Sequence, residues 1–169
     1  MSNSTLAEEK TEARPARPAR RFVRAWVPVV VWLMVIALES TPFMGADHTS
    51  GPLQRFFELF HGPFTSREWW HWHMAIRKTG HVVGYGILSI LFFRAFWMTF
   101  RTHAVVVARK LAAHPFSIAA TFLVASADEF HQTFLPNRTG VFSDVLIDTA
   151  GALIGQILIL IWMGNKTQP

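Results

Sequence analysis

The amino-acid sequence predicts an all-α protein: a four-helix transmembrane bundle with a short interfacial helix in the first outer loop. Of the 169 residues, 51% are hydrophobic and only 16% are charged, whereas a typical soluble domain carries about 25% charge. The charges are also unevenly placed, because residues 8–24 are rich in them and long later stretches carry none. Four apolar stretches of the chain are long enough to be candidates for crossing a bilayer.

The chain is basic: its net charge is +5 and its isoelectric point is near 10.4. Such a charge would also suit a nucleic-acid-binding protein. The basic residues, however, lie between apolar runs and do not line polar helix faces. We therefore expect no nucleic-acid partner, and we expect the positive charge to anchor membrane segments on the cytoplasmic side. The absence of cysteine excludes disulfides and thiolate chemistry.

Residues 1–21 are polar and rich in Ala, Pro and Arg, which predicts a disordered basic cytoplasmic tail. Residues 22–40 then form the first apolar span, with Pro28 in its first turns, where a helix tolerates proline best. A cleaved signal peptide is the alternative. We favour an uncleaved anchor, because the apolar run exceeds a normal signal-peptide core and no A-x-A site follows it.

Glycines and prolines break residues 41–79 into short pieces. Between them, apolar residues recur at helical spacing and predict a short amphipathic helix at the membrane surface: Leu53, Phe56, Phe57 and Phe60. A tryptophan cluster follows, and it is typical of an anchor at the level of the lipid headgroups: Trp69, Trp70 and Trp72.

Three further spans complete the predicted bundle: residues 80–100, 114–129 and 144–163. A basic loop over residues 101–113 separates the first two of these spans. A tight loop rich in Pro, Asn and Gly separates the last two. Residues 22–163 thus form one membrane domain, followed by a short cytoplasmic tail over residues 164–169.

The distribution of Lys and Arg predicts how the chain lies in the membrane. With the N-terminus in the cytoplasm, five of the 16 basic residues would lie outside: Arg55, Arg67, Arg77, Lys78 and Arg138. The other eleven would lie on the cytoplasmic side. This bias predicts that both termini are cytoplasmic.

Ionisable and polar residues enter the apolar spans mainly at the ends that this topology brings to the outer face. The candidate ligand-binding residues are Lys78, His81, Tyr85, Asp128, Glu129, His131, Gln132, Arg138, Asp144 and Asp148. Lys78, His81 and Tyr85 follow the i, i+3, i+7 spacing of one helix face. Because ionisable groups at membrane depth are costly, their convergence indicates a functional pocket.

An internal polar staple is the alternative to a pocket. Two cations, Lys78 and Arg138, would then neutralise part of a set of four carboxylates: Asp128, Glu129, Asp144 and Asp148. With neutral histidines the set keeps a formal charge of −2, which a pure staple would not need. The surplus therefore favours a pocket.

The spacing gives little support for a metal or a cofactor, and we expect neither. The His, Asp and Glu residues come from different helices and lack H-E-x-x-H or similar spacing. Gly151 and Gly155 form a G-x-x-x-G pair that predicts close helix packing, either within the bundle or between copies of the chain. The sequence leaves the oligomeric state open.

The same residues resemble the VanZ-like family of membrane proteins over about residues 25–163. The resemblance rests on K-x-x-H-x-x-x-Y at residues 78–85, D-E-x-H-Q-x-x-x-P-x-R at residues 128–138, and D-V-L-I-D-T-x-G-x-x-x-G at residues 144–155. The chain has Arg77 where many relatives carry an acidic residue and Asp148 where many carry Asn, so it resembles a DEFHQ/DVLIDT-type subgroup.

This resemblance implies a small multi-pass protein of the bacterial cytoplasmic (inner) membrane and cell envelope. The namesake of the family is linked to low-level resistance to teicoplanin, a lipid-tailed glycopeptide. The resemblance implies no particular reaction.

We therefore expect a non-enzymatic envelope protein. Its outer-leaflet pocket would bind a phospholipid headgroup or a lipid-linked cell-wall precursor, or would keep an amphipathic drug from the membrane surface, with Lys78 and Arg138 contacting the anion. One alternative is an intramembrane enzyme that acts on a lipid-linked substrate with His81 or Glu129 as general acid/base, although the sequence has no nucleophile motif. The other is a structural membrane partner whose charged cluster is only an internal staple.

Overall fold

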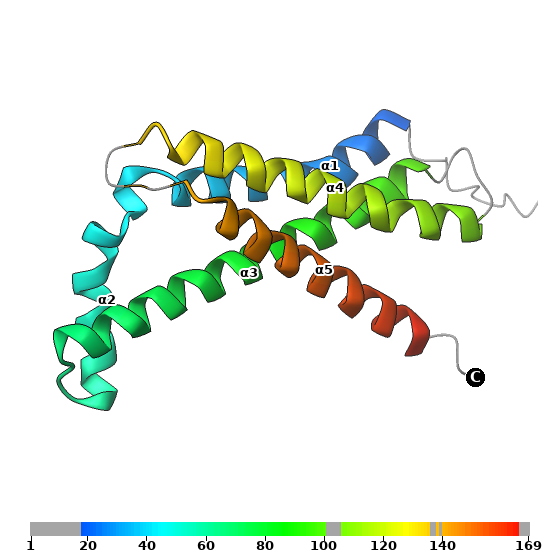
Figure 1. The fold of residues 1–169 in the computed structure, drawn as a ribbon. Helices are drawn as coiled ribbons and strands as arrows, with labels where there is room; N and C mark the ends of the chain where they lie inside the picture. The colour runs from blue at the N-terminus through cyan, green and yellow to red at the C-terminus, as the bar shows by residue number, and fades with distance from the viewer. Residues whose placement is uncertain (1–17, 101–105, 136–137, 139, 166–169) are drawn as a thin grey trace, which may run out of the picture.

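The computed structural model describes residues 18–100, 106–135, 138 and 140–165, and these residues form helices joined by short connections (Figure 1). The elements in chain order are α1 (Pro18–Glu39), the short 3-10 helix η1 (Pro42–Met44), α2 (Ala46–His61), α3 (Ser66–Thr99), α4 (Val106–Gln132) and α5 (Phe142–Asn165). The described part of the chain contains no strand. The all-α prediction is confirmed.

Among the described residues, three helices, α1, α3 and α5, are long and apolar enough to cross a membrane, and α4, which contains the third of the four predicted spans, is not one of them. Large apolar side chains are exposed along α1 and along the last turns of α5, among them Val30, Met34, Ile157 and Ile161. Exposed apolar faces of this length are stable when lipid covers them. The fold is therefore that of a membrane protein.

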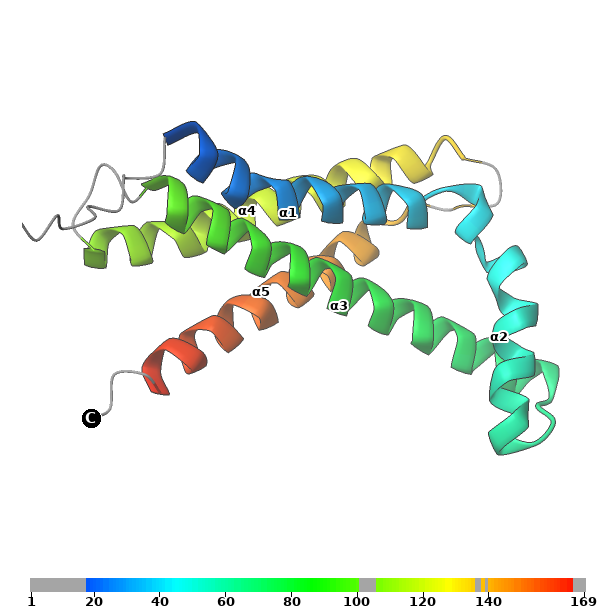
Figure 2. The same ribbon diagram turned by 180° about the vertical axis from the view of Figure 1, so that it is seen from behind.

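Helix α3 is the centre of the structure, because α1, α4 and α5 all pack against it and α4 also packs against α5. Figures 1 and 2 show that α3 and α5 cross, so that the first half of α3 and the last half of α5 point away from α1 and α4. Helix α2 packs against α3, near its N-terminal end (Figure 1). The arrangement is more open than that of a compact four-helix bundle.

Glycines make the crossing of α3 and α5 possible. A Cβ atom on Gly151 would collide with the carbonyl oxygen of Val82, and one on Gly155 would lie 2.6 Å from the carbonyl oxygen of Gly86. Small residues allow helix backbones to approach this closely. Of the two packing roles that the sequence left open, the G-x-x-x-G pair serves contact within one chain.

We expect Gly151→Ala to lower the free energy of unfolding by about 1–3 kcal/mol, because the added methyl group overpacks the crossing. The matched control is Gly84→Ala, since Gly84 lies in α3, the helix that Gly151 of α5 approaches, and a Cβ there meets nothing within 4 Å. Alanine at that position should be neutral or stabilise by up to about 1 kcal/mol. Unfolding in mixed detergent micelles measures both variants, and equal stability would contradict the close approach at Gly151.

Helix α3 begins at Ser66, 14 residues before the predicted start of the second span at residue 80. The cause is a capping box: the Thr65 hydroxyl accepts a hydrogen bond from the backbone N–H of Glu68, and the Glu68 carboxylate accepts one from the backbone N–H of Thr65 at 2.9 Å. The helix therefore continues through the tryptophan cluster, and the expected break before residue 80 is wrong.

Within that cluster, the three tryptophans have different surroundings. Trp69 is buried and donates from Nε1 to the hydroxyl of Ser50 on α2 at 2.7 Å. Trp70 and Trp72 are exposed, as a headgroup anchor requires. Trp69 thus fastens the amphipathic helix α2 to α3, and the other two tryptophans keep about half or more of their surface exposed.

Helices α1, α4 and α5 also begin before the predicted starts of their spans. Helix α1 starts at Pro18, inside the predicted tail, and residues 1–17 of that tail lie outside the described residues. Helix α4 starts at Val106 and passes through Pro115, so that most of the predicted basic loop is helical; residues 101–105 of the loop also lie outside the described residues. Helix α5 extends two residues beyond each predicted end of its span.

Candidate functional site

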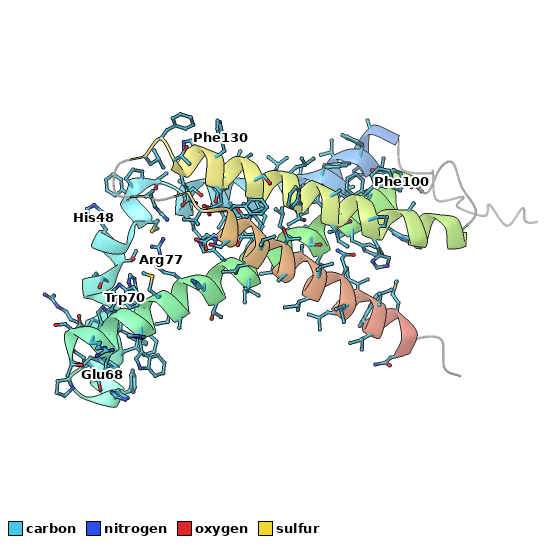
Figure 3. All side chains as sticks on the ribbon, in the orientation of Figure 1. His48, Glu68, Trp70, Arg77, Phe100 and Phe130 are labelled. Atoms are coloured by element: carbon cyan, nitrogen blue, oxygen red, sulfur yellow. The ribbon has the colours of Figure 1, made fainter. Side chains whose placement is uncertain are left out.

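A polar cavity of about 200 Å³ lies where α3, the end of α4 and the start of α5 meet. Its lining is Met74, Arg77, Lys78, His81, Glu129, Gln132, Arg138, Asp144, Ile147 and Asp148. In Figure 3, Arg77 lies on the upper side of α3, the side on which α5 begins. The structure thus brings seven of the ten candidate residues from the sequence around one cavity, and Tyr85, Asp128 and His131 are not among its lining.

Asp148 is the most deeply buried charged residue of this cavity, with none of its surface exposed. Its Oδ1 lies 3.2 Å from Nδ1 of His81, and because an ionised carboxylate can only accept, the histidine nitrogen donates. Its Oδ2 is buried and has no hydrogen-bond partner among the described residues. An unsatisfied buried acceptor costs about 1–3 kcal/mol, so the cavity offers an acceptor site to a ligand.

Glu129 fastens the connection between α4 and α5. The side chain is 4% exposed, and its Oε2 accepts a hydrogen bond from the backbone N–H of Val141 at 2.9 Å. Gly140 lies so close to α4 that a Cβ atom on it would collide with the carbonyl oxygen of Glu129. One carboxylate oxygen therefore has a structural partner, although the residue also lines the cavity.

Asp128 belongs to a different group of polar residues. Its carboxylate accepts hydrogen bonds from the hydroxyl of Ser40 at Oδ1 and, at Oδ2, from the hydroxyl of Tyr85 and the amide of Gln132, the last two at 3.0 Å each. These donors lie directly after α1, on α3 and on α4. Asp128 and Tyr85 line a smaller cavity, of about 20 Å³. The geometry is that of a staple between helices.

Among the described residues, the side chains of two of the three cations of the larger cavity donate to backbone carbonyl oxygens, and no hydrogen bond of the third, Lys78, is found. Nη2 of Arg138 donates to the carbonyl oxygens of Glu39 at 2.7 Å and Thr41 at 3.1 Å, and its Nε is buried without a partner among the described residues. Nη1 of Arg77 donates weakly to the carbonyl oxygen of Met44 at 3.4 Å. Lys78 is exposed. Within the described ranges, the one ion pair is His81 with Asp148, so none of these cations is neutralised by a carboxylate.

The charge balance of the cavity differs from the −2 that the sequence predicts. Three cations (Arg77, Lys78 and Arg138) line it together with three carboxylates (Glu129, Asp144 and Asp148), so it is formally neutral when His81 is neutral. Arg77 joins the cavity, and Asp128 takes no part in its lining. The predicted net charge of −2 is therefore wrong. The argument for a functional site now depends on the cations, none of which forms an ion pair with a carboxylate among the described residues.

Arg77, Met74 and Ile147 line the cavity but are not among the residues predicted from the sequence. Met74, Arg77 and Lys78 continue the helix face of His81 at i, i+3, i+4 and i+7, and this stripe is the signal that could have found two of them. Among the candidates, His131 is exposed and lies outside the lining of both cavities. In the part of the chain that the structure describes, no three His, Asp or Glu residues are grouped as metal ligands.

The chain matches one family of known proteins. The sequence profile of VanZ/LLP1 matches residues 25–163, a range that runs from the first turns of α1 into the last turn of α5 and contains the whole lining of the polar cavity. Neither a curated protein nor a solved structure matches the chain. Because the match covers most of the sequence, the chain belongs to the VanZ-like family.

Proposed function

We propose that the chain is a four-span protein of the bacterial cytoplasmic membrane whose polar cavity binds a phosphate-bearing headgroup at the outer leaflet. The headgroup would belong to a phospholipid or to a lipid-linked cell-wall precursor. One observation carries the proposal: three cations line the cavity, and among the described residues none of them forms an ion pair with a carboxylate. Cations near the surface of a membrane attract anionic lipid groups.

Four spans with both termini in the cytoplasm agree with the helix lengths and the arrangement. Helix α4 has 27 residues and is therefore about 40 Å long, more than the roughly 30 Å of the hydrocarbon core. The start of α1 and the end of α5 lie at the same end of the molecule in Figure 1. The polar cavity includes the end of α4 and the start of α5, which favours a position at the opposite, outer face.

Single cysteines test this topology cleanly, because the chain has none of its own. We expect a cysteine at Arg67, an exposed residue at the start of α3, to react with a membrane-impermeant maleimide in intact cells. A cysteine at Asn165, the last residue of α5, should react only after the cells are lysed. Labelling of both positions in intact cells would contradict an even number of spans.

The size of the cavity favours a headgroup over a whole drug molecule. Pockets for drug-sized ligands measure about 300–1,000 Å³, and this cavity measures about 200 Å³. A phosphate with a small substituent suits such a volume, while the lipid tails stay outside along the exposed apolar helix faces. Met74 and Ile147 supply apolar lining beside the charged groups, as the join between headgroup and tail requires.

Removing one cation should weaken headgroup binding without unfolding the protein. We expect Arg77→Gln to lower the affinity of the detergent-solubilised chain for dihexanoyl phosphatidylglycerol by about tenfold to a hundredfold, because a charge-assisted hydrogen bond contributes about 1.5–3 kcal/mol. Calorimetric titration measures the affinity. Arg67→Gln is the matched control, since this exposed arginine of α3 lies outside the cavity lining. Equal affinity of the Arg77→Gln and native chains would remove Arg77 from the proposed site.

Two more specific functions depend on this proposal, drug resistance and enzymatic activity, and both can be tested in cells. A link with teicoplanin resistance, which is associated with the namesake of the family, requires that cells with the native chain tolerate more of the drug than cells with the Arg77→Gln chain. The enzyme alternative, with His81 or Glu129 as acid/base, requires a changed lipid or precursor species in mass spectra after overexpression. Headgroup binding alone produces no new species.

A further inference from the structure

We infer that the ligand of this cavity is zwitterionic, with a phosphate and a primary ammonium group, as in a phosphoethanolamine headgroup. The inference rests on the proposed function and narrows it from any phosphate-bearing headgroup to one class. It depends on two features of the cavity: charges of both signs on different helices, and two buried atoms of opposite hydrogen-bonding type that lack partners among the described residues.

The charges of the cavity are divided by helix. Arg77 and Lys78 come from α3, whereas Asp144 and Asp148 come from one face of α5, where they stand four residues apart. A simple anion that binds the cations would be repelled by the nearby carboxylates. A simple cation that binds the carboxylates would be repelled by the arginines and the lysine. A ligand that carries both signs gains attraction from both sets.

The unpartnered acceptor identifies the positive end of the ligand. Oδ2 of Asp148 is buried on a residue with no exposed surface, and it faces no donor in the described part of the chain. It requires an N–H or O–H group. An ionised phosphate offers neither, and a quaternary ammonium such as choline has no N–H. A hydroxyl, as in glycerol, offers one donor and no charge, whereas a primary ammonium has three donors and a positive charge that matches the carboxylate. Asp144, half-buried in the same lining, gives that ammonium a second carboxylate.

The unpartnered donor identifies the negative end. Nε of Arg138 is buried with no acceptor among the described residues, while Nη2 of the same guanidinium is held by two backbone carbonyls. A planar guanidinium fixed along one edge presents its remaining N–H groups in a set direction, which suits a phosphate oxygen. One zwitterionic headgroup would therefore satisfy both Nε of Arg138 and Oδ2 of Asp148.

A series of short-chain lipids tests the inference on the full-length chain in maltoside micelles. The series is dihexanoyl phosphatidylethanolamine, phosphatidylcholine, phosphatidylglycerol and phosphatidic acid, each titrated by calorimetry. We expect phosphatidylethanolamine to bind at least tenfold more tightly than the other three. Phosphatidylcholine is the sharpest comparison, because it has the same charges but no N–H donor for Asp148.

The variant Asp148→Asn separates the ammonium contact from the phosphate contacts. It keeps the side-chain shape but replaces one oxygen by an N–H₂ donor, so phosphatidylethanolamine should bind to it no more tightly than phosphatidylcholine. The matched control, Glu58→Gln, changes a carboxylate of α2 outside the cavity lining and should keep the native preference. If Asp148→Asn does not fold, the lipid series on the native chain still decides the question.

Each outcome has one meaning. Equal binding of phosphatidylethanolamine, phosphatidylglycerol and phosphatidic acid overturns the zwitterion and leaves the phosphate site standing. Binding of none of the four overturns both proposals. A native preference in Asp148→Asn overturns the ammonium contact. Competition by water-soluble glycerophosphoethanolamine, as strong as by the lipid, supports the same chemistry with a free headgroup as its source, and weak competition supports it with a membrane lipid.

Discussion

Replacing Asp128 with alanine should lower the free energy of unfolding by about 3 kcal/mol or more. The carboxylate accepts hydrogen bonds from Ser40, Tyr85 and Gln132, and each bond to a charged group contributes about 1.5–3 kcal/mol. The loss leaves donors without partners, including the hydroxyl of Tyr85, a residue that is only 2% exposed. Unfolding in mixed micelles with increasing dodecyl sulfate measures the change.

A double-mutant cycle with Tyr85→Phe shows whether the two groups act together. In the native chain Tyr85→Phe should cost about 1.5–3 kcal/mol, because a bond to a charged acceptor is lost. In the Asp128→Ala chain it should cost almost nothing, because it removes a hydroxyl that already lacks its acceptor.

The control cycle pairs Tyr85→Phe with Asp144→Ala. Asp144 lines the larger cavity, whereas the hydroxyl of Tyr85 donates to Asp128 beside the smaller one. The effects of the control pair should therefore add. Additive costs for Asp128→Ala and Tyr85→Phe would contradict the staple.

The sequence predicted where the helices lie better than where they begin. A chain in lipid must satisfy its backbone groups internally, so apolar runs of sufficient length become helices. Helix ends depend on local capping. The capping box that starts α3 was readable as T-x-x-E at Thr65 and Glu68, but it stands among glycine, proline and tryptophan residues that favour an interfacial loop when read alone.

The predicted topology was enough to group most of the cavity residues, because it determines which helix ends share one face of the membrane. The topology alone could not predict which of these residues line the larger cavity and which line the smaller one. That division depends on how far each helix is rotated about its axis, and adjacent residues diverge by about 100°. Asp128 and Glu129 are such neighbours: the first lines the cavity beside Tyr85 and the second lines the larger one.

A polar cluster deeper along α5 was not predicted for the same reason. The amide of Gln156 donates to the hydroxyl of Ser89 at 2.7 Å and to its carbonyl oxygen at 3.0 Å, and its oxygen lies 2.7 Å from Nδ1 of His114. These residues lie on three helices, and no spacing within one helix relates them. Only the packing of α3, α4 and α5 brings them together.

Arg138 should have the second large effect, because it links the fold to the proposed site. Its Nη2 binds the carbonyl oxygens of Glu39 and Thr41 at the end of α1, where a cation is favourable to the helix dipole. Its buried Nε faces no protein acceptor among the described residues. We expect Arg138→Ala to lower the free energy of unfolding by about 2 kcal/mol and to abolish headgroup binding.

Arg138→Lys should separate these two roles. An ammonium can still donate to the carbonyl oxygens, so the free energy of unfolding should stay within about 1 kcal/mol of the native value. It has no second, fixed N–H for the phosphate, so affinity for dihexanoyl phosphatidylethanolamine should fall about tenfold. Arg55→Lys, at an exposed position of α2, should change neither quantity. Native affinity in Arg138→Lys would mean that Nε does not contact the ligand, and native stability in Arg138→Ala would mean that the carbonyl contacts do not hold α1.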